Sequence, residues 1–345
     1  MAHCTLIYPG LLGPDVPLDE LPQSEWPDKS SLPNLALLLD RSELAPVSRQ
    51  SLEQQILTAL GFEIKAGSEL PIAGIRMSGK ASVDVPVWCL DPAHVQIDRE
   101  MAYLAALDEL ALSEAEARQL IASLNEHFAD ELSIHYHSPQ HWLVQTDLQL
   151  FTRTPSEAIL QDISRMMPTG EDATPWRSLV NEIQMLLHNH PVNEARQQAG
   201  KLPVNSVWLW GGGAIKTVAP VFDTVYTDHA LAFVAAAHNQ VVCAELPQQL
   251  DAALFDNRSV LLVISKQLSA IQQKDVYAWF AALKQLEQTI LDPLLTLLKN
   301  GKLEHLVVQS DTLSLRLTRR DLRKWWRRHK SIEASILALR GRYGH

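Results

Sequence analysis

The residues best suited to chemistry lie in one stretch, Trp176 to Gly213, which reads WRSLVNEIQMLLHNHPVNEARQQAGKLPVNSVWLWGGG. A guanidinium such as that of Arg196 can hold a phosphate or carboxylate through two parallel hydrogen bonds. The imidazoles of His188 and His190 can donate to an anion or move a proton. These residue types indicate a binding site for a small anionic molecule. The candidate ligand-binding residues are Asn181, Glu182, Gln184, His188, His190, Asn193, Arg196, Asn205, Trp208, Trp210, Gly211, Gly212 and Gly213.

Each part of this stretch also has a purely structural interpretation. Asn and His near a helix end often cap backbone groups, which would leave Arg196 on the surface. Trp208 and Trp210 alternate on a predicted strand and share one face, where they would either floor a pocket or pack in the core. The triplet Gly211–Gly213 would either present N–H groups to a phosphate or simply make a tight turn. The residues alone leave these alternatives open.

Two further groups suggest metal or acid–base chemistry only weakly. His135 and His137 share one face of a predicted strand near His141, a geometry that zinc accepts, but no carboxylate lies immediately beside them. The pair Asp228-His229 opens an apolar helix, so an N-cap aspartate is the simpler interpretation. We therefore expect no metal and no cofactor.

A basic segment lies near the end of the chain. Arg316 to Lys330 contains eight Lys or Arg together with Trp325 and Trp326, and we predict a basic helix over Thr318–Arg328. Basic and aromatic side chains together can contact nucleic acid. The chain as a whole is acidic, with a net charge of −10, so docking on its own acidic surface or on an acidic protein partner is the better interpretation. Nucleic acid is not an expected partner.

The elements that position these residues alternate between strand and helix in the last third of the chain, which predicts an α/β fold with a partly parallel sheet. The predicted strands are Cys4–Tyr8, Val85–Leu90, Ser133–Tyr136, His141–Gln145, Val204–Trp210, Val241–Cys243, Val260–Ser265, Leu303–Val308 and Leu313–Leu317. The predicted helices are Leu32–Leu39, Ser51–Leu60, Ser113–Phe128, Ile159–Met166, Trp176–Asn189, Ala230–His238 and Gln272–Lys299, the last bent or split at Pro293.

The bulk composition is that of an ordinary globular protein, with 46% hydrophobic and 20% charged residues in 345. The length predicts two lobes, or one domain with a large insertion. Three scattered cysteines without a CxxC spacing suit a reducing compartment. The N-terminus lacks the pattern of a signal peptide, and no apolar run is long enough to span a bilayer, so we expect a cytoplasmic protein without membrane contact.

Several segments resemble a known family. NEIQMLLHNHPVNEAR and LPVNSVWLWGGG, together with TLIYPGLLGP, DPAHVQIDRE and LNEHFADELSIHYHSPQHWLVQ, resemble the RpfE-type regulatory proteins. These are similar in turn to the cofactor-independent phosphoglycerate mutases, which have an alkaline-phosphatase-like fold. The resemblance implies an α/β core with a mostly parallel sheet, covering 1–60 plus 215–345, and an inserted mixed α+β domain, 61–214.

The resemblance to the mutases fails where their chemistry resides. Those enzymes hold two divalent ions with Asp and His at strand ends. Here the first strand ends in Tyr8-Pro9-Gly10 where the family carries an aspartate, Ser265-Lys-Gln-Leu replaces an expected Asp-x-x-x-His, and Ser310-Asp311-Thr312 replaces Asp-His. The resemblance therefore implies a regulatory protein without metal-dependent catalysis that binds a small anionic or phosphorylated metabolite and acts through a protein partner. Two alternatives remain: an active mutase or phosphatase with unconventional ligands, and an interaction module using the basic C-terminal helix.

Overall fold

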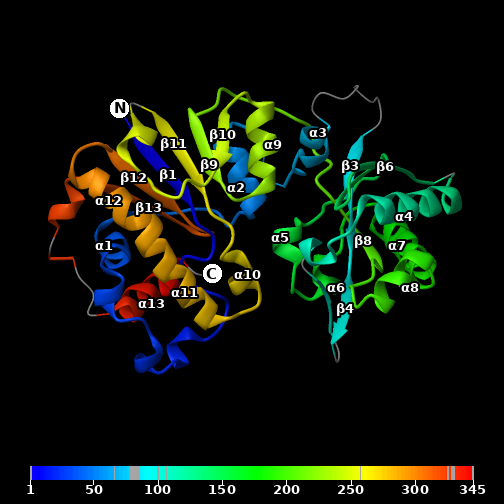
Figure 1. Cartoon of the computed structure of the whole chain (residues 1–345), viewed down its shortest axis with the longest axis horizontal. Helices are drawn as coiled ribbons and strands as arrows, with labels where there is room; N and C mark the ends of the chain where they lie inside the picture. Colours follow the sequence, from blue (N-terminus) through cyan, green and yellow to red (C-terminus); the bar gives the residue numbers. More distant parts are fainter. Residues whose placement is uncertain are drawn as a thin grey trace. The chain divides into compact units, whose positions relative to one another are not determined.

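The computed structural model describes residues 2–65, 67–77, 86–98, 101–105, 107–129, 131–256, 258–324, 326–327 and 331–343. The chain forms two compact units (Figure 1). Unit 1 contains Met1–Phe62 and Thr217–His345, and unit 2 contains Glu63–Lys216. The chain thus changes units at 62/63 and 216/217, compared with the 60/61 and 214/215 expected from the sequence.

Unit 1 is built on a seven-stranded, mostly parallel sheet with the order β10-β9-β11-β1-β12-β13-β2. The first five strands in that order are parallel, and β13 pairs antiparallel with both β12 and β2. The strands are β1 (His3–Ile7), β2 (Glu43–Pro46), β9 (Thr224–Thr227), β10 (Val242–Glu245), β11 (Ser259–Val263), β12 (His305–Gln309) and β13 (Leu313–Thr318). The mixed α/β class with a mostly parallel central sheet is therefore confirmed.

Burial explains why the central strands carry continuous apolar runs. All five residues of β11 are buried, because helices cover both faces of a parallel sheet. The helices of unit 1 are α1 (Pro33–Arg41), α2 (Leu52–Ala59), α9 (Ala230–His238), α10 (Leu268–Gln272), α11 (Val276–Leu286), α12 (Asp292–Lys299) and α13 (Ile332–Tyr343). The apolar sides of α1, α10, α11, α12 and α13 join β1, β11, β12 and β13 in one core.

Helices α11 and α12 form one rod across unit 1 (Figure 1), joined by a π-helical turn, Glu287–Leu291. The sequence predicts a bend or a break at Pro293, because proline lacks an N–H donor and clashes with the preceding turn. The wider π turn lies just before that proline and keeps the helix continuous. In the same turn, the buried Glu287 accepts hydrogen bonds from the backbone N–H groups of Asn34 and Leu35 (2.9 and 2.7 Å), which caps the start of α1.

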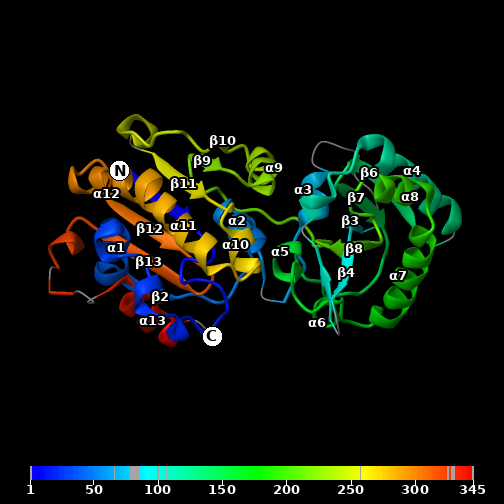
Figure 2. The same cartoon turned by 60° about the horizontal axis from the view of Figure 1, so that its bottom comes forward.

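Unit 2 has a four-stranded antiparallel sheet in the order β6-β7-β3-β8 and a separate hairpin, β4-β5. Helices α4, α7 and α8 lie together on one side of the sheet (Figure 2). The strands of unit 2 are β3 (Val87–Ala93), β4 (Val95–Asp98), β5 (Met101–Leu104), β6 (Ser133–Ser138), β7 (His141–Gln145) and β8 (Ser206–Trp210). The helices of unit 2 are α3 (Ile72–Arg76), α4 (Glu114–His127), α5 (Pro155–Ala158), α6 (Ile163–Met166), α7 (Ala173–His188) and α8 (Pro191–Gln198).

Strand β3 corrects one sequence expectation. The strand predicted over Val85–Leu90 ends before Asp91 and Pro92, and its first residue, Val85, lies outside the described residues. Asp91 and Pro92 instead lie within β3. Pro92 is tolerated there because β7 pairs with β3 only as far as Cys89, so the missing N–H donor faces no partner strand.

The two segments that connect the units are paired with each other by backbone hydrogen bonds. In unit 2, Glu63 N donates to Lys216 O at 2.8 Å, and in unit 1, Val218 N donates to Gly61 O at 2.8 Å. The two connecting segments therefore run side by side in opposite directions.

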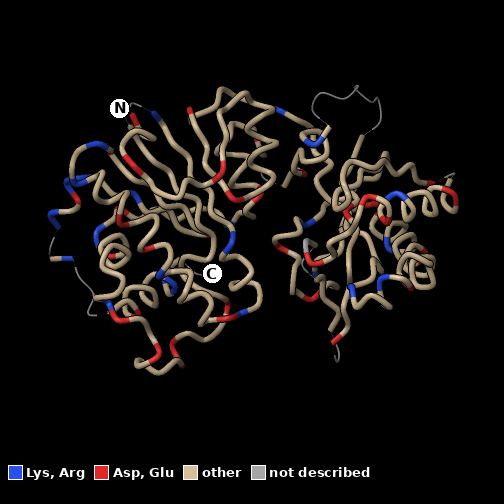
Figure 3. The backbone as a smooth tube through the Cα atoms, viewed as in Figure 1, with Lys and Arg blue, Asp and Glu red and all other residues tan. Residues whose placement is uncertain are grey.

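The basic segment after β13 is not the α-helix predicted over Thr318–Arg328. Thr318 is the last residue of β13, and Asp321–Arg323 forms a single 3₁₀ turn. Asp321 accepts hydrogen bonds from the backbone N–H and hydroxyl of Thr318 (2.9 and 2.6 Å), which fixes a turn instead of a helix start. Figure 3 shows Lys and Arg gathered along this segment, although Trp325 and Arg328 lie outside the described residues.

None of the helices in the described ranges combines the length and the apolar character needed to cross a lipid bilayer.

Candidate functional site

The carboxyl edge of the unit 1 sheet is where an α/β protein of this kind places its chemistry. Strands β1, β9, β11 and β12 are parallel, so the residues that follow them come to the same edge. Asp311, after β12, accepts a hydrogen bond from Gly10 N at 2.7 Å. Asp228, after β9, accepts from Ser265 N, Ser265 Oγ and Lys266 N at 2.8, 2.9 and 3.2 Å. Both carboxylates thus tie strand-end loops together.

Asp228 therefore corrects the interpretation of the Asp228-His229 pair. The residue at the N-cap of α9 is His229, and its backbone N–H donates to Thr227 Oγ1 at 2.9 Å. The apolar helix that follows Asp228 favoured the capping interpretation. The carboxylate of Asp228 instead accepts backbone N–H groups from the loop after β11.

The aspartates at this edge are already engaged within the protein. Tyr8 follows β1 and Ser265 follows the end of β11, and both Asp228 and Asp311 accept backbone N–H groups. Burial, together with the nearby charge of Asp228, raises the pKa of Tyr8, so its phenol stays protonated. Among the residues that the structure describes, no three His, Cys, Asp or Glu side chains are grouped as metal ligands.

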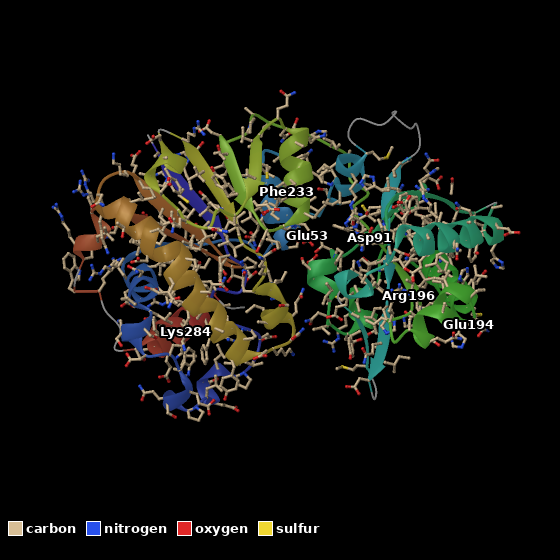
Figure 4. All side chains as sticks on the ribbon, in the orientation of Figure 1. Glu53, Asp91, Glu194, Arg196, Phe233 and Lys284 are labelled. Carbon is tan, nitrogen blue, oxygen red and sulfur yellow. The ribbon has the colours of Figure 1, made fainter. Side chains whose placement is uncertain are left out.

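In unit 2, helix α8 carries Arg196, which is labelled in Figure 4. Arg196 and Asn193 of the same helix are buried, each about 1% exposed. Arg196 donates to the carbonyls of Leu202 (2.8 Å) and Leu110 and to the carboxylate of Glu116 (3.0 Å). Asn193 bonds both backbone groups of Val204 (2.7 and 2.8 Å). These contacts tie α8 to α4 and to the segment that enters β8, so the two best candidates for a ligand contact are bonded to the protein itself.

The other polar candidates bond to separate protein groups or face solvent. His190 caps α8: its Nδ1 accepts from Val192 N (3.2 Å), which leaves Nε2 to donate to Ser123 Oγ (3.0 Å). Burial lowers the pKa of His190 and keeps it neutral. Gln184 donates to Ser206 Oγ at 3.1 Å, and Asn205 bonds both backbone groups of Val95. The exposed candidates are Asn181, Glu182 and His188.

Trp208 and Trp210 lie on one face of β8 and are 3% and 4% exposed. The neighbouring Val207 and Leu209 face the main core of unit 2, so the two tryptophans occupy the opposite face of the sheet. Trp208 Nε1 donates to Arg153 O at 2.9 Å, and Trp210 Nε1 donates to Asp91 Oδ2 at 2.8 Å. Both indole donors thus have protein acceptors.

The glycine triplet makes a packed turn against α3 and the segment before it. A Cβ on Gly212 would lie 2.2 Å from the Trp88 ring, and one on Gly213 would lie 2.0 Å from Glu69 O. The Gly213 N–H donates to Leu70 O at 2.9 Å, and the Gly211 N–H bonds the Glu69 carboxylate. These two N–H groups are used within the protein.

Replacing Gly213 with alanine tests this packing. We expect Gly213→Ala to lower the free energy of unfolding by about 1–3 kcal/mol, because the new methyl group meets backbone atoms that cannot rotate away. Urea unfolding followed by tryptophan fluorescence measures the change. Gly341→Ala is the control, since nothing lies within 4 Å of its Cβ position; an equal loss in the two variants would contradict the packing argument.

A polar cluster that the sequence analysis did not single out centres on Asp91, a fully buried carboxylate in β3. Arg76, from α3, donates two hydrogen bonds to it (2.8 and 3.1 Å). Trp210 Nε1 donates a third, and the Arg76 guanidinium lies 5.1 Å above the Trp210 ring. His141, at the start of β7, places Nδ1 3.5 Å from Asp91 Oδ1 while its side chain remains 39% exposed. The cluster joins four elements of unit 2.

The charge of Arg76 favours the ionised form of Asp91. Burial opposes ionisation of Asp91, but the charge of Arg76 and the contacts with Arg76 and His141 outweigh it and lower the Asp91 pKa. Burial raises the pKa of the neighbouring Cys89 thiol to about 12, so it remains protonated and is a poor nucleophile at neutral pH. A buried carboxylate that faces one nitrogen of a half-exposed imidazole leaves the other nitrogen available for proton transfer or an anion. His141, one of the three histidines considered for a metal, contacts a carboxylate that is 50 residues away in the sequence.

Comparison with known proteins places unit 2 near one enzyme family. Residues 92–193 match the family described as 2,3-bisphosphoglycerate-independent phosphoglycerate mutase. A probable mutase of this kind from Geobacter sulfurreducens is 40% identical over 65 residues, covering 19% of this chain and 16% of that protein. The enzyme from Methanosarcina barkeri is 30% identical over 114 residues, covering 32% of this chain and 29% of that protein. The chain is distantly related to these mutases, and the matched segments span less than a third of those two relatives' length.

Two solved structures align with most of the chain at low identity. The cofactor-independent phosphoglycerate mutase from Thermoplasma acidophilum aligns with a TM-score of 0.44 and 13% identity over 97% of this chain and 95% of that one. The PH0037 protein from Pyrococcus horikoshii aligns with a TM-score of 0.46 and 12% identity over 92% and 87%.

Proposed function

We propose that this chain is a regulatory protein of the RpfE type, built on an alkaline-phosphatase-like core. In this proposal it binds a small anionic or phosphorylated metabolite and acts through a protein partner, without metal-dependent phosphoryl transfer. The distant relation to the mutases over residues 92–193 supports the choice of ligand class. The acidic charge of the chain favours a protein partner over nucleic acid.

One observation supports the part of this proposal that says metal-dependent catalysis has been lost. At the carboxyl edge of the unit 1 sheet, Asp228 and Asp311 accept hydrogen bonds from loop N–H groups, and a serine or tyrosine stands at the other strand ends. A metal ion would compete with those backbone donors for the same carboxylate oxygens. An edge arranged in this way favours a rigid scaffold over a pair of metal ligands.

Turnover and metal content test the proposal together. Purified protein is incubated with Mn²⁺, Co²⁺, Zn²⁺ or Mg²⁺, desalted and analysed for metal, and the interconversion of 2- and 3-phosphoglycerate is followed beside a known mutase. We expect substoichiometric metal and no interconversion above the protein-free rate. Two bound ions per chain together with turnover would overturn the proposal.

An active mutase or phosphatase with unconventional ligands is the second candidate. The contact between His141 and the buried Asp91 favours it, because this pair could move a proton in a reaction. Under this alternative, turnover would appear in the same assay and would fall in His141→Ala.

A further inference from the structure

Unit 1 contains a cavity of about 860 Å³ far along the chain from the segments that match the mutases. It lies where the end of α1, the start of β2, the segment after the 3₁₀ turn and the end of α13 meet. Its lining residues are Leu39, Asp40, Ser42, Glu43, Leu44, Lys324, Arg327, Ala338, Leu339, Arg342 and Tyr343. The volume lies within the range of small-molecule sites.

Three cations line this cavity, and two of them form no ion pair with the residues that the structure describes. Lys324 bonds Asp321 at 2.5 Å. Arg327 and Arg342 are exposed and form no ion pair with any residue in the described ranges. Two guanidiniums on the wall of one cavity suit a doubly charged group such as a phosphate.

The acidic residues of the lining do not cancel these charges. Asp40 is bonded to Lys29 at 3.0 Å and accepts from Ser335 Oγ at 2.8 Å, so its charge is already balanced. Glu43 is the remaining carboxylate. The local balance therefore stays in favour of an anion.

A buried hydroxyl on the wall gives a second, independent sign of a ligand. Ser42 is 2% exposed, and its Oγ has no hydrogen-bond partner within the described part of the chain. Buried polar atoms are almost always bonded, and an exception calls for a missing partner. Because Ser42 lines the cavity, a ligand inside it is able to supply that partner.

We propose that this cavity binds a small organic phosphate, held through its phosphate by Arg327 and Arg342 and through a polar atom by Ser42. The side chains of Leu39 and Leu339 line the cavity beside these groups. This inference rests on the proposed function only in taking the ligand to be anionic; it holds whether or not the protein is a catalyst.

Isothermal titration of the full chain with three probes tests the site. Wild-type protein is titrated with 3-phosphoglycerate, inorganic phosphate and glycerate. We expect 3-phosphoglycerate to bind, inorganic phosphate to bind more weakly, and glycerate, which lacks the phosphate, not to bind. Arg327→Ala and Arg342→Ala should each raise the Kd for 3-phosphoglycerate about tenfold or more, because each removes a charge-assisted contact.

Two further variants separate the site from general charge and from folding. Arg49→Ala removes an exposed arginine of the same unit outside the cavity and should leave Kd unchanged. Ser42→Ala removes an unbonded hydroxyl, so it should weaken binding without lowering the unfolding midpoint. Unchanged Kd in the Arg327→Ala/Arg342→Ala double variant would overturn this site and leave the proposed function standing. Failure of the wild type to bind either phosphate probe would overturn this inference and the ligand part of the proposed function, while the metal and turnover assay would still decide catalysis separately.

Discussion

Asp91→Ala is expected to destabilise unit 2 by about 3–5 kcal/mol, because removal of one partner of a buried ion pair leaves the other charge uncompensated. The Arg76 side chain is only 9% exposed and would lose both of its hydrogen bonds to Asp91. Trp210 Nε1 would lose its acceptor as well. Urea unfolding followed by tryptophan fluorescence reports the change, since Trp210 contacts the cluster directly.

The control for this prediction is Asp98→Ala, which removes an exposed carboxylate from β4 of the same unit and should change stability by less than about 0.5 kcal/mol. Asp91→Asn keeps an acceptor for the Trp210 indole but removes the charge. Its loss of stability should therefore lie between those of Asp91→Ala and Asp98→Ala. If Asp91→Ala unfolds at the same urea concentration as wild type, Arg76 does not depend on this carboxylate.

The same carboxylate should make stability depend on pH. The Asp91 pKa is lower in the folded protein than its unfolded value of about 3.9. Its contribution is therefore fully present above that value and is lost as the pH falls through the folded pKa. The stability difference between wild type and Asp91→Ala should therefore shrink as the pH falls below about 4.

Arg196→Met should also cost about 3–5 kcal/mol, because it leaves the carbonyls of Leu110 and Leu202 and the carboxylate of Glu116 without their buried donor. Methionine keeps much of the volume, so the loss reports hydrogen bonds and charge more than a cavity. The matched control is Arg118→Met: Arg118 forms an exposed pair with Glu114 at 2.8 Å, and such a pair contributes about 0–1 kcal/mol.

Arg196 also distinguishes the two interpretations of the α7–α8 segment. If its guanidinium braces α8 against α4, Arg196→Met lowers stability and changes 3-phosphoglycerate binding only through unfolding. If it holds a ligand, binding is lost while the unfolding midpoint stays near that of wild type. Titrations carried out well below the unfolding midpoint of the variant separate these results.

The sequence predicted those elements whose signals are local. The predicted helix start at Ser113 matches α4, where Ser113 and Glu116 form a capping box, and the apolar runs placed β1, β11 and β12. Such signals depend on residues three or four apart, or on one buried strand, so no knowledge of tertiary contacts is needed.

The hydrogen-bond partners of the polar side chains could not be predicted from such local sequence signals. Asp91 lies 15 residues from Arg76, 50 from His141 and 119 from Trp210 along the chain, and only the folded sheet of unit 2 brings them together. Arg196 and Glu116 are 80 residues apart. The types of these residues suggested chemistry, but their contacts depend on packing between elements. The helix predicted over Thr318–Arg328 was wrong for a local reason. The hydrogen bonds between Thr318 and Asp321 form a turn there, although the spacing of the residues is helical.

The paired crossings at Gly61–Val218 and Glu63–Lys216 have an evolutionary consequence. Because unit 2 begins and ends at neighbouring points, all of it is able to be gained, lost or exchanged in a single genetic event, and a turn of a few residues would reseal the chain. The portion that matches the mutases and the portion that carries the arginine-lined cavity can therefore diverge at different rates, with one kept by descent while the other acquires a new ligand.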